Sequence, residues 1–230
     1  MSSMHHNRIH VPIKQPEDVI PHLGRPTHWK AGRSAQMAVE AWFHAKGLPS
    51  SIENLLATCP AFAEAELIDA FLERAVELGD GGRPSQTDVM AIVGCKGQLG
   101  ILAVEAKVDE TFGPLVSEWL ELEKPGSDAR SNRLKYLCAL LGLDPKRVGS
   151  LRYQLLHRTA SPLLEARRYR SKLAAMVVQS FCPKLSWLDD FQRFALELGF
   201  GHLEPDNLSV LHPHDGIELG IGWASSARMP

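Results

Sequence analysis

One short segment of the chain has the alternation of a β-strand and carries two charged side chains on the same side. Side chains of an extended strand point alternately to two faces, and residues 100–108 are apolar on one of them. The other face ends in Glu105 and Lys107, which are two residues apart and therefore point the same way. The segment predicts a mostly buried strand whose end presents an acid and a base to one site.

A second apolar run, residues 89–93, lies just before this strand. If the two strands form a hairpin with Val93 opposite Gly100, Asp88 lies opposite Glu105. Directly opposed residues have Cβ atoms ~5 Å apart, so two carboxylates there repel each other. A divalent cation removes this repulsion, because Mg²⁺ is commonly held by one or two carboxylates together with phosphate and water. The pattern predicts an Mg²⁺ or Mn²⁺ site, and it predicts that neutralising either acid stabilises the metal-free protein.

Similar triplets elsewhere in the chain lack this context. Residues 144–146 contain a proline, which removes a strand hydrogen bond, and indicate a turn. Residues 165–167 lie in a helical pattern, where side chains two apart do not share a face. Only Glu105 and Lys107 combine strand alternation with a partner acid upstream. The alternative for this pair is an exposed, salt-bridged strand end.

The order of an acid, a spacer, and a second acid followed two residues later by lysine resembles the PD-(D/E)XK phosphodiesterase superfamily, which includes restriction endonucleases and repair nucleases. The matching residues are Asp88, Glu105 and Lys107. The match departs at Pro84, which lies four residues before Asp88 and not beside it. The resemblance implies a three-layer α/β sandwich, in which helices flank a central mixed β-sheet, and it implies metal-dependent cleavage of DNA by these three residues.

Three longer segments, residues 28–35, 81–88 and 152–158, resemble a bacterial domain family of unassigned function within that superfamily. This similarity covers roughly residues 20–182. In nucleases of this fold an acid of the first helix often joins the metal site, which makes Glu40 a candidate ligand. The alternative is a boundary glutamate that pairs with a nearby cation.

Gln154 matches half of another signature. A glutamine followed four residues later by tyrosine marks the RecB-like nucleases, and here Arg158 occupies the second position. Gln154 and Arg158 are candidates for contacts to phosphate or to metal-bound water. Ordinary polar surface residues are the alternative.

Charge is strongly segregated along the chain, although the formal net charge is only −2. Residues 53–123 hold 14 acids and 4 bases, whereas residues 124–172 hold 12 bases and 3 acids. A basic sector suits phosphate binding, and its candidate DNA contacts are Arg152, Arg158, Arg167 and Arg168. The alternative is that oppositely charged segments pack together or line solvated helices.

At 230 residues the chain suits a single domain with a full hydrophobic core. We expect an irregular N-terminal arm over 1–33, a nuclease-like α/β core over 34–185, and a C-terminal elaboration of the same domain over 186–230. The four cysteines are widely spaced and predict reduced thiols. No apolar run approaches the ~18 residues needed to cross a bilayer, and the expected location is the cytoplasm.

Hydrophobic periodicity and turn residues predict the remaining elements. Helices are expected over residues 34–45 (capped by Ser34 and ended at Gly47), 52–57, 115–122, 132–141, 151–170 (kinked or broken near Pro162) and 187–198. Strands are expected over 71–78, 173–181, 208–211 and 217–223. His202, His212 and His214 are interpreted as polar loop residues, because no cysteine or helical histidine pair accompanies them.

The sequence thus favours a restriction-endonuclease-like nuclease that acts on DNA with Mg²⁺ or Mn²⁺. A non-catalytic module that binds nucleic acid or protein on the same fold is the alternative. A homodimer, or a partner protein of a defence system, also stays open.

Overall fold

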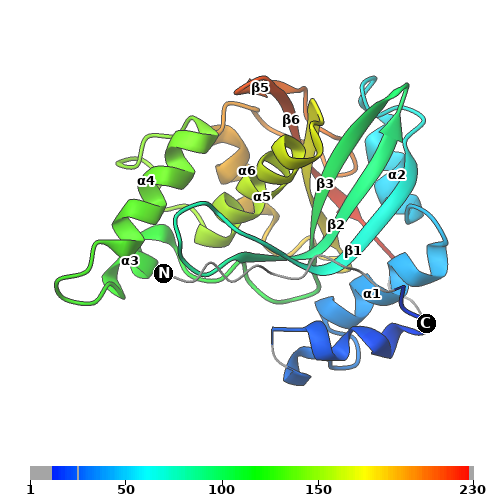
Figure 1. Cartoon of the computed structure of the whole chain (residues 1–230), viewed down its shortest axis with the longest axis horizontal. Helices are drawn as coiled ribbons and strands as arrows, with labels where there is room; N and C mark the ends of the chain where they lie inside the picture. Colours follow the sequence, from blue (N-terminus) through cyan, green and yellow to red (C-terminus); the bar gives the residue numbers. More distant parts are fainter. Residues whose placement is uncertain (1–11, 25, 228–230) are drawn as a thin grey trace.

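The computed structural model describes residues 12–24 and 26–227, which form an α/β protein with one six-stranded mixed sheet packed against helices (Figure 1). The strands are β1 (Glu66–Val76), β2 (Ser85–Cys95), β3 (Gln98–Lys107), β4 (Leu173–Ser180), β5 (His212–His214) and β6 (Ile217–Ser225). Their order in the sheet is β1-β2-β3-β4-β6-β5. β3 and β6 run parallel to β4, and the other neighbours are antiparallel.

The hairpin of β2 and β3 has the predicted register, with Val93 opposite Gly100. The connection is tighter than the expected loop, because pairing continues to the last residue of β2. Only Lys96 and Gly97 form the turn, and both have positive φ, 43° and 86°. Two positive φ values are typical of the short hairpin turns whose twist matches that of the strands.

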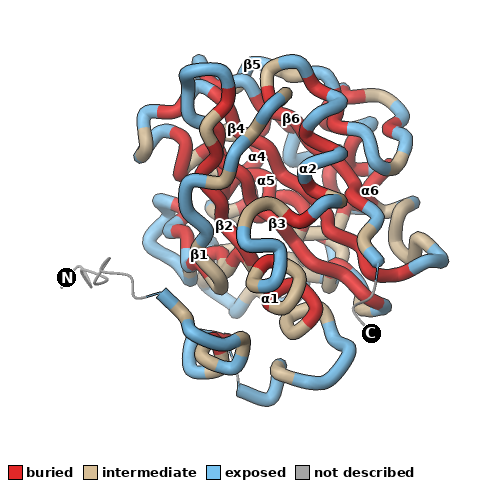
Figure 2. The backbone as a smooth tube through the Cα atoms, turned by 90° about the vertical axis from the view of Figure 1, so that its right-hand side faces the viewer, coloured by how far each residue is buried: buried red, intermediate tan, exposed pale blue. Residues whose placement is uncertain are grey.

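Helices cover both faces of this sheet. They are α1 (Ser34–Ala45), α2 (Ser50–Ala57), α3 (Val116–Glu121), α4 (Ala129–Leu141), α5 (Tyr153–Tyr169) and α6 (Leu188–Glu197), preceded by two 3₁₀ helices, η1 (Pro16–His22) and η2 (Pro26–His28). Ile101 and Ala103 of β3 pack in the cluster with α4, α5 and α6. Leu102 and Val104 pack in the cluster with α1 and α2. Alternation along one strand therefore separates two cores, and buried residues fill the centre of the molecule (Figure 2).

β4 is buried at every residue, as predicted for a strand covered on both faces. The segment after residue 186 is not peripheral to the sheet, because β6 pairs with β4 along its whole length. The C-terminal elaboration thus contributes an interior strand of the central sheet.

Several predicted boundaries were wrong. β1 begins at Glu66, five residues before the predicted strand. α1 covers the predicted residues 34–45, but Lys46 and not Gly47 takes the left-handed conformation at its end, and Arg33, not Ser34, is the N-cap. β5 comprises His212–His214, whereas the predicted strand 208–211 makes only a single bridge, from Leu208 to Gly222.

The predicted break near Pro162 is also wrong, because α5 is one helix from Tyr153 to Tyr169. Its side chains are largely buried against β2, β3 and β4. Packing along the whole length of α5 offsets the loss of the one helix hydrogen bond that a proline removes.

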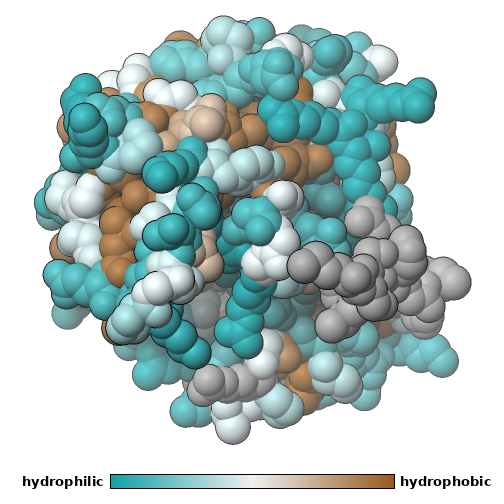
Figure 3. Space-filling model, turned by 60° about the vertical axis from the view of Figure 1, so that its left-hand side comes forward, coloured by the Kyte–Doolittle hydropathy of each residue, from teal (hydrophilic) through white to brown (hydrophobic). Residues whose placement is uncertain are grey.

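Polar groups cover most of the face shown in Figure 3, with apolar patches between them. The large apolar side chains that stay exposed are Ile68, Leu99, Leu122, Leu196 and Val210, which belong to separate segments. None of the helices in the described part of the chain has the length and apolar character that a bilayer crossing requires.

Gly100 tests the close packing of the hairpin. A Cβ added there would lie 2.8 Å from a ring carbon of Phe62 and 3.0 Å from Val93. We expect Gly100→Ala to lower the free energy of unfolding by about 1–3 kcal/mol, measured by urea denaturation. Gly47→Ala is the matched control, because its Cβ would meet nothing closer than 3.9 Å. Equal stability of the two variants would contradict this packing.

Candidate active site

Three carboxylates lie in a row across three neighbouring strands. The register of β1 on β2 places Glu73 beside Asp88, because the residues on either side of them are paired. The register of β2 on β3 continues from the pair Val89 and Val104 to Asp88 and Glu105. The predicted juxtaposition of Asp88 and Glu105 therefore fits the observed register. Glu73 was missed, because a long loop joins β1 to β2 and leaves their register open.

Glu73 and Asp88 are fixed by different contacts. The carboxylate of Glu73 accepts a hydrogen bond from Gln86 Nε2 at 2.7 Å. Its backbone has φ 54°, a left-handed conformation that is uncommon for a residue with a side chain. Asp88 Oδ2 accepts a hydrogen bond from the backbone N–H of Ala106 at 2.7 Å, which ties β2 to the end of β3.

Glu105 is the most heavily bonded of the three acids. It is 2% exposed and lies beside Lys107, whose Nζ donates to Glu105 Oε1 at 2.7 Å. From α5, Gln154 Nε2 donates to the same oxygen at 2.7 Å, and Arg158 Nε donates to Oε2. Lys107 also donates to Gln154 Oε1 at 3.0 Å. Glu105 and Lys107 thus share a face as predicted, but they are buried and not an exposed strand end.

α5 brings Gln154 and Arg158 to the site because residues four apart share a helix face. Both were predicted site residues, and both contact Glu105 directly. Arg158 Nη1 also donates to the hydroxyl of Ser85 at 2.9 Å. The position that carries tyrosine in the RecB-like signature therefore holds a buried cation here.

Ser85 and His157 form a polar group behind Arg158 that the sequence did not reveal. Ser85 Oγ lies 2.9 Å from His157 Nδ1, and Ser161 Oγ lies 3.1 Å from Ser85 Oγ. Burial, together with the nearby Arg158, lowers the pKa of His157 well below its usual value. A neutral imidazole accepts a hydrogen bond at Nδ1, so Ser85 can donate to His157 while it accepts from Arg158.

The electrostatics of the three acids differ. Burial and the neighbouring Asp88 raise the pKa of Glu73 to about 8. Burial and Glu105 raise the pKa of Asp88 to about 7. Burial opposes ionisation of Glu105 as well, but Arg158 and Lys107 outweigh it and lower its pKa. Glu105 is therefore ionised and paired, whereas the other two carboxylates repel each other when charged.

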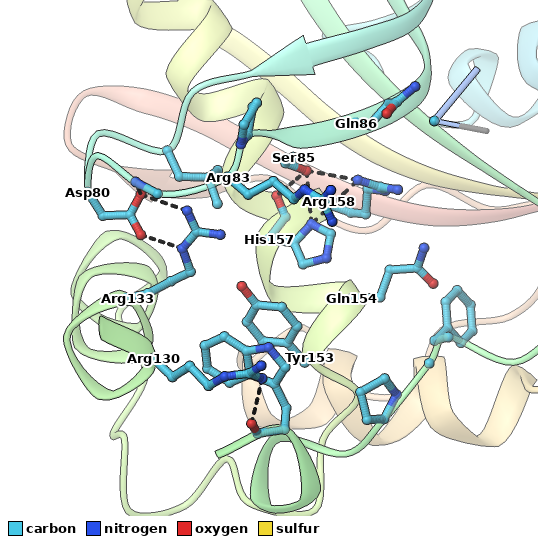
Figure 4. A pocket seen from close by; sticks show the side chains of 18 of the residues that line it. Asp80, Arg83, Ser85, Gln86, Arg130, Arg133, Tyr153, Gln154, His157 and Arg158 are labelled. Carbon is cyan, nitrogen blue, oxygen red and sulfur yellow. Dashed lines mark hydrogen bonds and ion pairs between the residues drawn. The ribbon is translucent and has the colours of Figure 1, made fainter. Parts of the chain in front are cut away.

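Two connected cavities open onto these residues. The smaller, about 530 Å³, is lined by Glu73, Asp88 and Glu105, and by residues of the arm between Leu23 and Ala35. The larger, about 1430 Å³, lies between the loop before β2 and the α3, α4 and α5 helices (Figure 4). Both are lined by Gly24, His28, Gln86, Lys107, Gln154 and Arg158. The cavity with the three acids thus lies beside the larger cavity and shares part of its lining.

Other predicted site residues lie elsewhere. Glu40 accepts a hydrogen bond from Gln36 and lines neither cavity. Glu73, and not the predicted Glu40, is the acid that lies beside Asp88 and Glu105 in the smaller cavity. Arg152, Arg167 and Arg168 pair with Asp190, Asp215 and Glu165, and they line neither cavity. Of the four arginines expected to bind DNA, the structure brings only Arg158 to the site.

The donor set of the site suits a hard divalent cation only in part. Among the described residues, no three His, Cys, Asp or Glu side chains are grouped as ready-made metal ligands. Asp88 and Glu105 nevertheless present carboxylate oxygens at one end of the sheet, and Mg²⁺ is commonly held by one or two carboxylates with phosphate and water. The residues fit a metal that shares its coordination with substrate, and not a closed structural site.

The family of the chain is clear from comparison with known proteins. A family model described as a domain of unknown function, DUF6946, matches residues 12–228. The chain belongs to this family. The match is longer than the predicted similarity over residues 20–182, and it includes the C-terminal strands. A comparison with curated proteins found no match, and neither did one with solved structures.

The raised pKa values predict how the stability of the metal-free protein depends on pH. Asp88 has a folded pKa of about 7 against an ordinary value of 3.8, so the folded state binds more protons than the unfolded state between these values. Stability therefore falls as the pH rises through this range. We expect Asp88→Asn to raise the free energy of unfolding by on the order of 1–2 kcal/mol at pH 8, and by less at pH 5.

Urea denaturation at the two pH values measures this difference. Asp69→Asn is the matched control, because Asp69 is an exposed acid on β1 outside both cavities. A gain for Asp88→Asn that does not change with pH would contradict the assigned repulsion.

Proposed function

We propose that this DUF6946 chain is a metal-dependent phosphodiesterase that acts on DNA and has a restriction-endonuclease-like fold. The observation that carries the proposal is that Asp88, Glu105 and Lys107 line one cavity, next to a larger cavity whose charged lining is mainly basic. The order and spacing of these residues are those of the PD-(D/E)XK pattern. A six-stranded mixed sheet between helices is compatible with the fold that the pattern implies.

In this proposal Asp88 and Glu105 hold the cation, and Glu73 adds negative charge beside them. A bound Mg²⁺ or Mn²⁺ supplies Lewis-acid chemistry, polarising a phosphate and lowering the pKa of a bound water. Lys107 is held by Glu105 and Gln154 at 2.7 Å and 3.0 Å, which aims its ammonium group into the cavity. An ammonium group fixed there offsets the charge that develops on a phosphate oxygen in the transition state.

Substitutions of two residues separate metal binding from turnover. We expect Asp88→Asn to lose both Mn²⁺ affinity, measured by calorimetry, and cleavage of plasmid DNA. Lys107→Ala is expected to keep Mn²⁺ affinity and to lose about 10²-fold or more in cleavage rate, because its role is in the transition state. The control is Asp69→Asn, which should cleave like the parent. If Asp88→Asn and Lys107→Ala also cleave like the parent, the site is not catalytic.

Glu105→Gln is a poor test of catalysis. The sequence alone predicts that this neutralisation stabilises the metal-free chain, and the contacts of Glu105 reverse that prediction. The carboxylate of Glu105 is paired with Lys107 and Arg158, and neutralising that carboxylate leaves two buried cations without their anion. Breaking a buried pair in this way costs on the order of 3–5 kcal/mol. We therefore expect a lower melting temperature for Glu105→Gln, measured by calorimetric scanning, in contrast to Asp88→Asn.

A non-catalytic binding module is the second candidate, and one observation favours it. The bonds of Glu105 to Lys107, Gln154 and Arg158 satisfy its carboxylate without a metal. A module of this kind would bind nucleic acid but take up no Mn²⁺. Calorimetric titration of the parent chain with Mn²⁺ distinguishes the two, since the phosphodiesterase must show binding that Asp88→Asn abolishes.

A further inference from the structure

The larger cavity has the composition of a nucleic-acid binding surface. Its charged lining includes Lys107, Arg83, Arg130, Arg133 and Arg158, and Asp80 is the one acid among the described residues that line it. Asp80 is itself paired with Arg133, and Glu105 of the smaller cavity is paired with Lys107 and Arg158. The excess of positive charge in the larger cavity therefore comes mainly from Arg83 and Arg130.

Two of these arginines make no ion pair within the described ranges, although the backbone N–H of Arg130 donates to Glu123. Arg83 is exposed, on the loop before β2, and makes no ion pair there. Arg130 on α4 makes no ion pair either, and its Nη1 donates to the backbone carbonyl of Trp119 at 2.8 Å. Figure 4 shows Arg83 and Arg130 on opposite walls of the cavity. Unpaired guanidinium groups facing a polar cleft are suited to phosphate oxygens.

Planar side chains line the wall that carries Arg130. The rings of Trp119 and Tyr153 are stacked, with centroids 3.8 Å apart and an angle of 10° between planes. Arg130 lies over the Trp119 ring at 5.1 Å, and His157 lies 4.9 Å from Tyr153 on the other side. The two rings are therefore enclosed between Arg130 and His157, and their stack holds Arg130 at the wall of the cavity.

The arm before α1 limits the form in which a strand reaches the acids. Residues between Leu23 and Ala35 line the acidic cavity, and the arm is tied to β2 because Gln86 Nε2 donates to His22 O at 3.1 Å. Glu105 and Lys107, at 2% and 4% exposure, line the same cavity as the arm. The arm therefore narrows the approach to these two residues, which suits a thin single strand better than a rigid duplex.

We infer that the larger cavity is a track for single-stranded DNA, which leads one phosphate to Lys107. Arg83 and Arg130 bind phosphates on the two walls, and the stacked Trp119 and Tyr153 hold Arg130 in place. This inference rests on the proposed function and deepens it by naming the form of the substrate. It also assigns binding to arginines other than Arg152, Arg167 and Arg168.

Binding without cleavage tests the track directly. Fluorescence anisotropy of a labelled 20-nucleotide strand is measured with the full chain in EDTA, and compared with the duplex of the same sequence. We expect the single strand to bind about tenfold more tightly or better. Arg83→Ala should weaken that binding and reduce the slope of log affinity against log salt by about 0.7, the value for one phosphate contact on a single strand. Arg167→Ala, which removes a cation outside the cavity, should leave both unchanged.

The stacked pair has its own matched control. Trp119→Leu should weaken binding of the strand about threefold, since it removes the cation–π contact that holds Arg130 at the wall. Trp187→Leu should not, although Trp187 is also partly buried against the same apolar cluster and also lies under an arginine, Arg152. Arg83 is exposed, so Arg83→Ala should melt at the temperature of the parent. An unchanged melting temperature shows that weaker binding comes from the lost contact and not from unfolding.

Each outcome decides the inference. Equal affinity for duplex and single strand overturns it, and so does parental binding by both Arg83→Ala and Trp119→Leu. Cleavage of duplex but not of single strands in Mn²⁺ overturns the track and leaves the phosphodiesterase standing. Selective binding of single strands, lost in Arg83→Ala, supports the track even if Mn²⁺ produces no cleavage, a result that would overturn the proposed function alone.

Discussion

The buried carboxylate of Glu105 joins the sheet to α5, and the rest of the site depends on this contact. A buried charge is tolerated only when it is paired and hydrogen-bonded, because its lost hydration must be offset. Lys107 offsets it from β3, and Gln154 and Arg158 do so from one face of α5. The same bonds therefore fix the helix on the sheet and hold the polar groups of the cavity in place.

This arrangement divides the acids into two kinds. Glu105 is stabilised as an anion, whereas burial raises the pKa of Glu73 and Asp88, and no cation of the described residues lies within hydrogen-bonding distance of either. Carboxylates that are costly to ionise in the folded protein are typical of functional sites, although structural ion-pair networks also shift pKa values. The cavity beside these two acids is where added positive charge, from a cation, would be most favourable.

The sequence predicted the part of the site that depends on local periodicity. Alternation placed Glu105 and Lys107 on one face, and a hairpin with few unpaired residues left little freedom for the register of Asp88. Glu73 escaped prediction because eight residues separate β1 from β2 and do not specify how those strands pair. Charge clustering did not show which arginines face the cavities, for a different reason. The acids that pair with Arg152 and Arg167 are Asp190 and Asp215, 38 and 48 residues away in the sequence, and such pairs cannot be recognised from the sequence.

Arg158 bears on whether the site is a phosphodiesterase or a binding module. Where the RecB-like signature has a neutral tyrosine, this chain places a cation against Glu105 Oε2, so a metal at that oxygen competes with an existing ion pair. Substrate changes this balance, because a phosphate brings both oxygen ligands for the metal and an alternative anion for the guanidinium group. On the proposed function, metal affinity therefore rises when the strand is bound. In a binding module the pair of Glu105 and Arg158 persists, and the phosphate meets only the arginines of the larger cavity.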